Sequence, residues 1–299
     1  MTNLRTKGYS LSSICNYVGI SRQGYHKRLK QYSTKKTLYR SMEQVVIDNR
    51  KEKSRGGLRS IYHKEKLSSL LGINQFEQQM SKLGYALKPY TSFIKTTDSR
   101  GSHSMFDNLI SGKEINGENQ VIVGDITYYR NSSDLYYIFH FQDYYTLEIK
   151  GLVGSKTIEG VYAEKCLRQV FSYNHKSKYE YNLILHTDRG GQYRSNKFQQ
   201  MIRKAQIQPS HAGNCLENGL SERANGVIKN EYLVDYDIRS ESQLNSVLSK
   251  IKKQINEVWP SKTLGYKTPK EYAQTMRLMN KEGRPLKVVR ELKCEKKGF

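Results

Sequence analysis

The sequence predicts an α/β protein, in which a mixed five-stranded sheet with helices is preceded by an all-α basic region. Segments of β type begin only at residue 121, after about ninety residues of helical periodicity. From there the patterns give three strands, a helix, a strand, a helix, a strand and further helices. The charge divides the chain in the same way: residues 1–100 hold 20 basic and 6 acidic side chains, whereas residues 101–200 hold 11 of each.

The first region, residues 1–90, is predicted to be helical and to bind DNA. Within residues 10–30, apolar side chains recur at helical spacing, Gly19 follows, and Ser21 is placed to cap a second, short helix. This rhythm is typical of a helix-turn-helix, although an ordinary helical hairpin fits it equally well. A second helical unit is expected at about 43–85. The excess of positive charge favours DNA binding. The candidate contacts are the basic residues of the second helix, Arg22, Lys27 and Arg28.

Composition sets the remaining boundaries. Residues 91–118 are rich in Ser, Thr, Gly and Asn without a sustained period, which predicts a linker. Residues 119–258 form the predicted core. Its strands are expected at 121–130, 134–145, 146–155 and 181–188, its helices at 158–175, 195–206 and from 217 to 258, and a short extended segment after 206. The basic tail, 259–299, shows no clear order.

The overall composition favours a polyanionic partner. A net charge of +22 and a pI of about 9.7 point to nucleic acid rather than to an acidic small molecule. The four cysteines lie far apart, so neither a disulfide framework nor a structural zinc site is indicated. No apolar run approaches the roughly 20 residues that span a membrane. We therefore expect no membrane partner and a bacterial cytoplasmic protein associated with the nucleoid.

Three carboxylates are the candidate catalytic residues. Asp125 and Asp188 each end an apolar strand segment, and Glu222 lies near the start of a helix. If the two strands are neighbours, both aspartates emerge at one edge of the sheet, where an adjoining helix can deliver the glutamate. Such carboxylates repel one another unless divalent cations neutralise them, and oxygen-only ligands favour Mg or Mn over zinc. Taken singly, each has an ordinary explanation as a strand end, a turn or an exposed helical charge.

Three sequence blocks then carry a family resemblance. VIVGDITYY, LILHTDRGGQYRS and GNCLENGLSERANGVIKNEYL resemble the core blocks of insertion-sequence transposases related to retroviral integrases. The similarity is greatest to the insertion-sequence family three group, in the protein of its second reading frame. It also extends to the segment at 10–30, to SRGGLRSIY and LGINQFEQQMSKLGY, and to the closing TLGYKTPKEYA. The second and third core blocks are specific.

The resemblance implies a fold, a chemistry and a set of site residues. The core would have a ribonuclease-H-like fold, and Asp125, Asp188 and Glu222 would form the Asp-Asp-Glu triad that holds two divalent cations, Mg or Mn. The expected enzyme is a polynucleotidyl transferase that cuts the element ends and joins them to target DNA. Lys229, seven residues after Glu222, would share a helical face with it and hold a phosphate.

The sequence departs from the family pattern at two places. Only 33 residues separate Asp188 from Glu222, two fewer than is usual, and Glu217-Asn218 replaces an Asp-Asn pair. Glu217 is therefore an alternative third ligand, although Glu222 fits the block better. Trp259 and Ser261 stand where relatives commonly have an Arg and a His, which indicates a changed contact.

Two further residues and two rival functions stay open. His186 lies two residues before Asp188 but inside an apolar strand, where a core role is more common. Asp143 follows an apolar run and could face the site or begin a turn. The rivals are a nuclease of the same fold that only hydrolyses DNA, and an inactive DNA-binding regulator derived from a transposase. The resemblance also implies a homo-oligomer on DNA and a possible helix-turn-helix partner encoded in an upstream frame.

Overall fold

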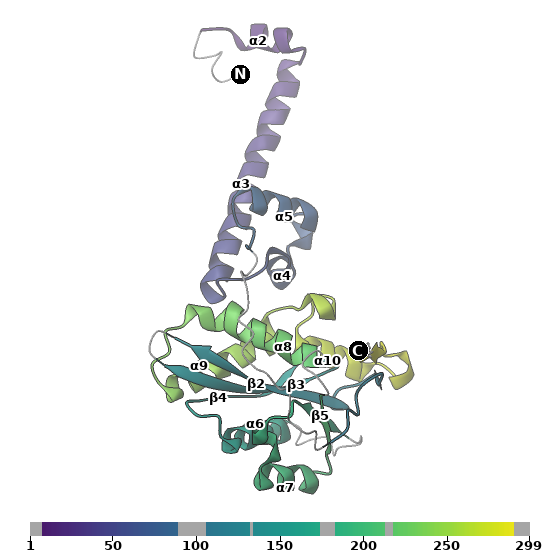
Figure 1. Ribbon diagram of the computed structural model, residues 1–299. Helices are drawn as coiled ribbons and strands as arrows, with labels where there is room; N and C mark the ends of the chain where they lie inside the picture. Colours follow the sequence, from purple (N-terminus) through teal and green to yellow (C-terminus); the bar gives the residue numbers. More distant parts are fainter. Residues whose placement is uncertain (1–7, 89–105, 132–133, 174–182, 213–217, 290–299) are drawn as a thin grey trace, which may run out of the picture.

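The computed structural model describes residues 8–88, 106–131, 134–173, 183–212 and 218–289. A helical N-terminal part stands on one face of an α/β core, and a long helix carries the first helix away from that core (Figure 1). The observed order of strands and helices in the core is the predicted one. In the described part of the chain, no helix combines the length and the apolar character that a membrane span needs.

The first two helices form a helix-turn-helix arrangement. Helix α2 (Leu11–Val18) ends at Gly19, whose φ of 70° is the left-handed conformation that glycine adopts readily. Ser21 caps helix α3 by accepting a hydrogen bond from the Gly24 N–H at 2.9 Å. The expectation of a short second helix is wrong, because α3 (Arg22–Glu52) has 31 residues. No breaker separates its start from the second helical unit, so one helix joins the two.

The second helical unit packs on the last part of α3. Helices α4 (Leu58–Lys64) and α5 (Ile73–Lys82) are joined by a short 3₁₀ helix, η1 (Leu67–Ser69). Met42 and Val46 of α3 are buried in the same hydrophobic cluster as side chains of these helices. That cluster continues into the core, so the helical unit and the sheet share one interior.

The core is a five-stranded mixed sheet with the strand order β4-β3-β2-β5-β6. Strands β2, β3 and β4 form an antiparallel meander, while β5 and β6 run parallel to β2. This order and these directions are those of a ribonuclease-H-like fold. The strands are β2 (Val121–Arg130), β3 (Leu135–Asp143), β4 (Ile149–Ser155), β5 (Ile184–Thr187) and β6 (Gln208–His211).

Helices cover both faces of this sheet (Figure 1). On one face lie α6 (Gly160–Tyr173) and α7 (Asn196–Lys204), which connect β4 to β5 and β5 to β6. On the other face lie α8 (Gly219–Gly226) and α9 (Glu241–Lys253). Between these two, the chain passes through a π-helical segment, η4 (Val227–Tyr232), and a 3₁₀ turn, η5 (Leu233–Asp235), before the predicted break. A second π segment, η6 (Gln254–Val258), follows α9.

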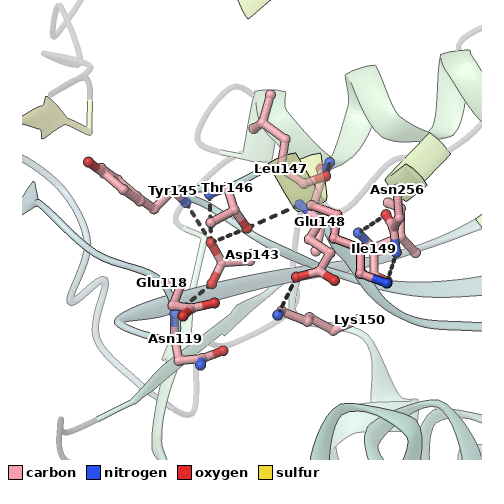
Figure 2. Close-up of polar contacts among 12 residues, drawn as sticks. Glu118, Asn119, Asp143, Tyr145, Thr146, Leu147, Glu148, Ile149, Lys150 and Asn256 are labelled. Atoms are coloured by element: carbon pink, nitrogen blue, oxygen red, sulfur yellow. Dashed lines mark hydrogen bonds and ion pairs between the residues drawn. The ribbon is translucent and has the colours of Figure 1, made fainter. Parts of the chain in front are cut away.

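Asp143 organises the turn between β3 and β4 (Figure 2). Its Oδ1 accepts hydrogen bonds from the Tyr145 and Thr146 backbone N–H groups and from the Thr146 hydroxyl, at 2.7–3.0 Å. Its Oδ2 accepts the Asn119 N–H at 2.6 Å. The turn interpretation of Asp143 is therefore confirmed. Opposite Ile122 near the start of β2, it lies three register positions from Asp125.

The expectation of an unordered tail from residue 259 is wrong as far as residue 289. Helix α10 (Pro269–Leu278) begins with a capping box in which Thr268 and Glu271 exchange hydrogen bonds, with Pro269 at its first position. Further on, β7 (Lys287–Val288) pairs with β1 (Glu114–Ile115), so the end of the predicted linker is also ordered. The rest of that linker, up to residue 105, lies outside the described residues, as do residues 290–299.

Candidate catalytic site

Asp125, in the middle of β2, and Asp188, directly after β5, lie close together on two neighbouring interior strands of the sheet. Strands β2 and β5 are parallel neighbours, and Val123 pairs with His186. Each aspartate comes two residues after its member of this pair, so both side chains leave the sheet on the same face. The prediction that two neighbouring strands bring these aspartates together is confirmed. Both carboxylates are partly buried.

The surroundings of the Asp125 carboxylate disfavour its negative charge. Burial, and then the negative charges of Asp188 and Glu222, raise its pKa from 3.8 to about 7. Two hydrogen bonds oppose this shift: the Ile126 N–H donates to Oδ1 at 2.9 Å, and the Asn225 side-chain amide donates to Oδ2 at 2.8 Å. A buried carboxylate that faces other negative charges is the condition that a bound divalent cation relieves.

Asp188 is held by the loop that follows it. Its Oδ1 accepts the Gly190 N–H at 3.0 Å. A Cβ at Gly190 would approach that oxygen to 3.0 Å and the Gln192 side chain to 2.7 Å, so a larger residue would crowd the carboxylate. Burial raises the pKa of Asp188, while the Gly190 hydrogen bond and the charge of Arg194 lower it.

Glu222 lies in the first turn of α8, the helix that packs beside β2. Its side chain is exposed and makes no hydrogen bond or ion pair with the other described residues, yet it is close enough to raise the pKa of Asp125. Asn218 precedes the helix and donates its amide to the Gly124 carbonyl at 3.3 Å, which joins the helix start to β2. The alternative ligand Glu217 lies outside the described residues.

Lys229 lies near Asp125, but it does not share a regular α-helical face with Glu222 as predicted. The helix changes from α to π geometry at Val227, so Glu222 and Lys229 do not lie two turns apart on one regular α-helix. The Lys229 ammonium lies 4.9 Å from the centre of the Tyr128 ring, a cation–π contact. Burial lowers the pKa of Lys229, while Tyr128 and Asp125 raise it. The lysine is thus within electrostatic reach of Asp125.

The donor set at this site fits a hard divalent cation. Its candidate ligands are carboxylate oxygens, which Mg and Mn prefer. In the described residues, no three His, Cys, Asp or Glu side chains are already grouped closely enough to enclose an ion. The two aspartates are fixed by backbone and amide hydrogen bonds, whereas Glu222 has a solvent-exposed side chain that can turn toward them.

The other candidate residues lie in the hydrophobic core or on the N-terminal helix α3. His186 is fully buried, bonds the Ser210 hydroxyl through Nδ1 at 2.9 Å, and has its pKa lowered to about 4 by burial, so it is a neutral core residue. Arg22, Lys27 and Arg28 are exposed on the first turns of α3, far from the carboxylates along the chain.

Trp259 joins the core to the helical unit, whereas Ser261 makes a local backbone pair. Trp259 is only 4% exposed, and the ammonium groups of Lys53 and Lys64 lie 5.0 and 4.9 Å from its ring. Lys53 also forms an ion pair with Glu231 of η4 at 2.6 Å. Ser261 pairs through its backbone with Lys267. At position 259, the departure from the family pattern therefore corresponds to an internal packing contact.

The sequence analysis missed two residues of the site, Asn225 and Tyr128. Asn225 is three residues after Glu222, which is the spacing of neighbours on one helical face, and this pattern could have indicated it. Nothing in the sequence marks Tyr128 among 23 tyrosines, because its contact with Lys229 depends on the π segment.

Comparisons with known proteins agree with this fold. The integrase core domain family matches residues 116–214, and a second integrase core domain family matches residues 203–269. The transposase for the insertion sequence element IS904 of Lactococcus lactis is 27% identical over 157 residues, covering 52% of this chain and 61% of that protein, less than two thirds of its length. The transposase InsF for insertion sequence IS3A of Escherichia coli is 22% identical over 222 residues, covering 72% of this chain and 76% of that protein.

Among solved structures, the catalytic core domain of HTLV-2 integrase, solved in complex with magnesium, aligns with 56% of this chain and 99% of its own, at 21% identity and a TM-score of 0.42. The two family matches together span the sheet, α8 and the segment as far as the start of α10. The chain thus carries an integrase core domain over residues 116–269 and is similar to the transposases of IS3-type insertion sequences.

Proposed function

We propose that this protein is a DNA transposase that cuts the ends of an insertion sequence and transfers the cut strand to a new phosphodiester. The observation that carries this is the pair Asp125 and Asp188, each two residues beyond the paired Val123 and His186 of the neighbouring parallel strands β2 and β5. Glu222 and Lys229 lie in electrostatic reach of the first of them. Carboxylates of this kind with a cation beside them suit phosphodiester chemistry, in which negative charge develops on both attacking and leaving oxygens.

Each side chain has a distinct task in this proposal. Asp125, Asp188 and Glu222 would hold two Mg or Mn ions, whose chemistry would be to activate a water or the 3′ hydroxyl of the DNA as nucleophile and to neutralise charge on the leaving oxygen. Asn225 fixes the orientation of the Asp125 carboxylate through its 2.8 Å hydrogen bond. Lys229, held over the Tyr128 ring, presents a positive charge to a phosphate beside the carboxylates.

The helical N-terminal region would bind the DNA duplex. Residues 22–42, the first two thirds of α3, contain seven basic side chains and no acidic one. This part of the helix is largely exposed, including Arg22, Lys27 and Arg28. Phosphate contacts of this kind give salt-dependent affinity. We assign DNA binding to residues 1–90 and catalysis to residues 119–258, on a homo-oligomer assembled on DNA, with an upstream-frame helix-turn-helix protein as a possible partner.

Removal of divalent cations is expected to abolish cutting and joining. With EDTA, a labelled duplex carrying one end of the element should stay intact, and Mg or Mn should restore both nicked and joined products. The DNA affinity, measured by a gel-shift assay, should change little, because α3 supplies positive charge without metal. Cutting in EDTA would contradict the proposal. Nicking without joined product would favour the nuclease, and binding without any cutting would favour the regulator.

Asn225→Ala should weaken cation binding without unfolding the protein. The variant removes the amide that orients Asp125, and loss of such an outer hydrogen-bond partner typically costs about 10–100-fold in metal affinity or activity. The Mg concentration for half-maximal cutting should therefore rise. Asn196→Ala, at the exposed first position of α7, is the matched control and should leave that concentration unchanged. An unchanged Mg requirement for Asn225→Ala would show that the hydrogen bond does not serve the site.

A further inference from the structure

A cavity of about 240 Å³ lies behind α8, where the helical unit meets the core. Its walls come from α8, η4 and η6, from the β3–β4 turn and from the segment after Trp259. Much of the lining is apolar, and its apolar members are Leu147, Ile149, Leu220, Ala224, Val227 and Ile255. Trp259 and Tyr232 add aromatic rings to the same walls. The space is therefore suited to a flat group that fills it by contact.

Two buried polar atoms of the cavity lining lack partners. The indole N–H of Trp259 has no acceptor within the described structure, and Oε1 of Gln142 has no donor there. Both residues are more than nine-tenths buried, at 4% and 7% exposure, and both line the cavity. The other end of the Gln142 amide is fixed, because it donates to the Leu147 carbonyl at 2.8 Å. Both atoms lie just beneath the wall surface, where a small shift of the lining would bring one donor and one acceptor to the edge of a nucleobase.

Positive charge lies at the rim of the cavity. Arg223 and Lys262 line it and are exposed. The only acidic lining residue, Glu231, is paired with Lys53. A group entering this space therefore passes two cations, which is favourable for a phosphate-linked ligand.

The cavity is next to the catalytic carboxylates along the chain. Arg223 directly follows Glu222 on α8, so the helix presents one side chain to the site and the next to the cavity. A DNA strand held at Asp125 would run past the rim. We propose that the cavity receives one base, turned out of the DNA duplex beside the cutting position. This inference rests on the proposed function, because that function is what brings DNA to α8.

In this arrangement the base edge bonds to the Trp259 N–H and the Gln142 oxygen, the ring contacts the apolar walls, and Arg223 and Lys262 hold the flanking phosphates. Turning a base out costs unpairing and unstacking, which contacts in the pocket offset. Such a step separates the strands at the cutting position and fixes the register of the DNA at the carboxylates.

The test uses the fluorescent base 2-aminopurine, which brightens when it leaves the stack. The full-length Asp188→Asn protein, which should bind DNA without cutting it, is added to duplexes of the element end that carry 2-aminopurine at one position each. One position near the cutting site should brighten several-fold. Adding Thr263→Phe, at an exposed residue of the rim, should plug the cavity and remove the signal, while DNA affinity stays within about 3-fold. Gln274→Phe, an exposed position of α10 outside the cavity, should leave the signal intact.

The two proposals fail separately in this design. No brightening at any position, or brightening that Thr263→Phe leaves unchanged, overturns the base pocket. Cutting and joining by the otherwise unchanged protein are measured in parallel. Normal cutting without brightening refutes the pocket alone, whereas brightening without any cutting refutes the catalytic function alone. Absence of DNA binding refutes both.

Discussion

Asp125→Asn is expected to give a protein that does not cut DNA but is more stable than the unchanged protein at pH 8 without divalent cations. The Asp125 pKa is about 7 in the folded chain and 3.8 as the ordinary value, because burial and two neighbouring carboxylates disfavour its charge. At pH values between these two pKa values, the folded state binds more protons than the unfolded state. The free energy of unfolding therefore falls as the pH rises from about 4 to about 7. The neutral amide avoids this loss, which is up to about 4 kcal/mol for a shift of this size.

The measurement is the free energy of unfolding by urea at pH 8 and at pH 4, with cutting assayed in Mg. The stabilisation by Asn should be present at pH 8 and largely absent at pH 4, where the carboxyl is protonated in the folded state and half-protonated in the unfolded one. Mg should narrow the gap at pH 8 by stabilising only the unchanged protein. Cutting should fall by at least about 10³-fold, the size expected when a transition-state charge loses its stabilising cation. An inactive protein that is also destabilised at pH 8 would mean that Asp125 is structural.

Asp143→Asn is the matched control, since it is also a buried aspartate of the sheet. Four hydrogen-bond donors converge on its two oxygens (Figure 2). An amide must direct an N–H group at one of those donors, which leaves a buried donor unpaired at a cost of about 1–3 kcal/mol. At position 125 the Asn225 amide can reverse, so that its unpartnered oxygen accepts the new N–H. The same substitution should therefore destabilise the protein at position 143 and stabilise it at position 125.

The second large effect concerns the contact between the helical unit and the core. A Cβ on Gly56 would lie 2.7 Å from the six-membered ring of Trp259, whereas a Cβ on Gly57 would meet nothing within 4 Å. Gly56→Ala should therefore force the two parts to separate locally and cost about 1–3 kcal/mol, while Gly57→Ala should cost less than about 1 kcal/mol. Because Trp259 is the single tryptophan, its fluorescence reports on this contact alone.

For Gly56→Ala, the tryptophan emission should shift to longer wavelength as water reaches the ring, and the unfolding midpoint in urea should fall. Gly57→Ala should keep the emission of the unchanged protein. The Lys53–Glu231 ion pair ends on the segment that carries Lys229, so Gly56→Ala should also reduce cutting. Equal behaviour of the two alanine variants would show that the helical unit does not pack on Trp259.

The order of strands and helices could be predicted because each strand of the core has a local pattern. Asp125 and Asp188 could be placed near each other because each comes directly after an apolar run, and these two runs pair in parallel. The sequence did not show that Asp125 lies in the middle of its strand. The π segment at Val227 could not be predicted, because apolar periodicity does not distinguish a single π turn from an α turn. The order after residue 259 was missed even though Thr268, Pro269 and Glu271 carry the pattern of a capped helix start.

The packing of Trp259 could not be predicted from the sequence for a different reason. As a position in a family block it indicated only a changed contact, since sequence does not say which surface a side chain meets. Its burial depends on Gly56 and Lys53, some two hundred residues earlier in the chain. Long-range contacts of this kind are decided by tertiary packing, which periodicity does not record.

The most direct test of the catalytic triad compares Glu222→Gln with Glu217→Gln in a strand-transfer assay with Mg, using a labelled duplex of the element end and a plasmid target. If Asp125, Asp188 and Glu222 act together, Glu217→Gln should give joined product at a level close to that of the unchanged protein. Glu222→Gln should lower the amount of joined product by at least about 10³-fold. Both variants should retain their affinity for DNA. Joined product from Glu222→Gln together with its loss in Glu217→Gln would contradict the account.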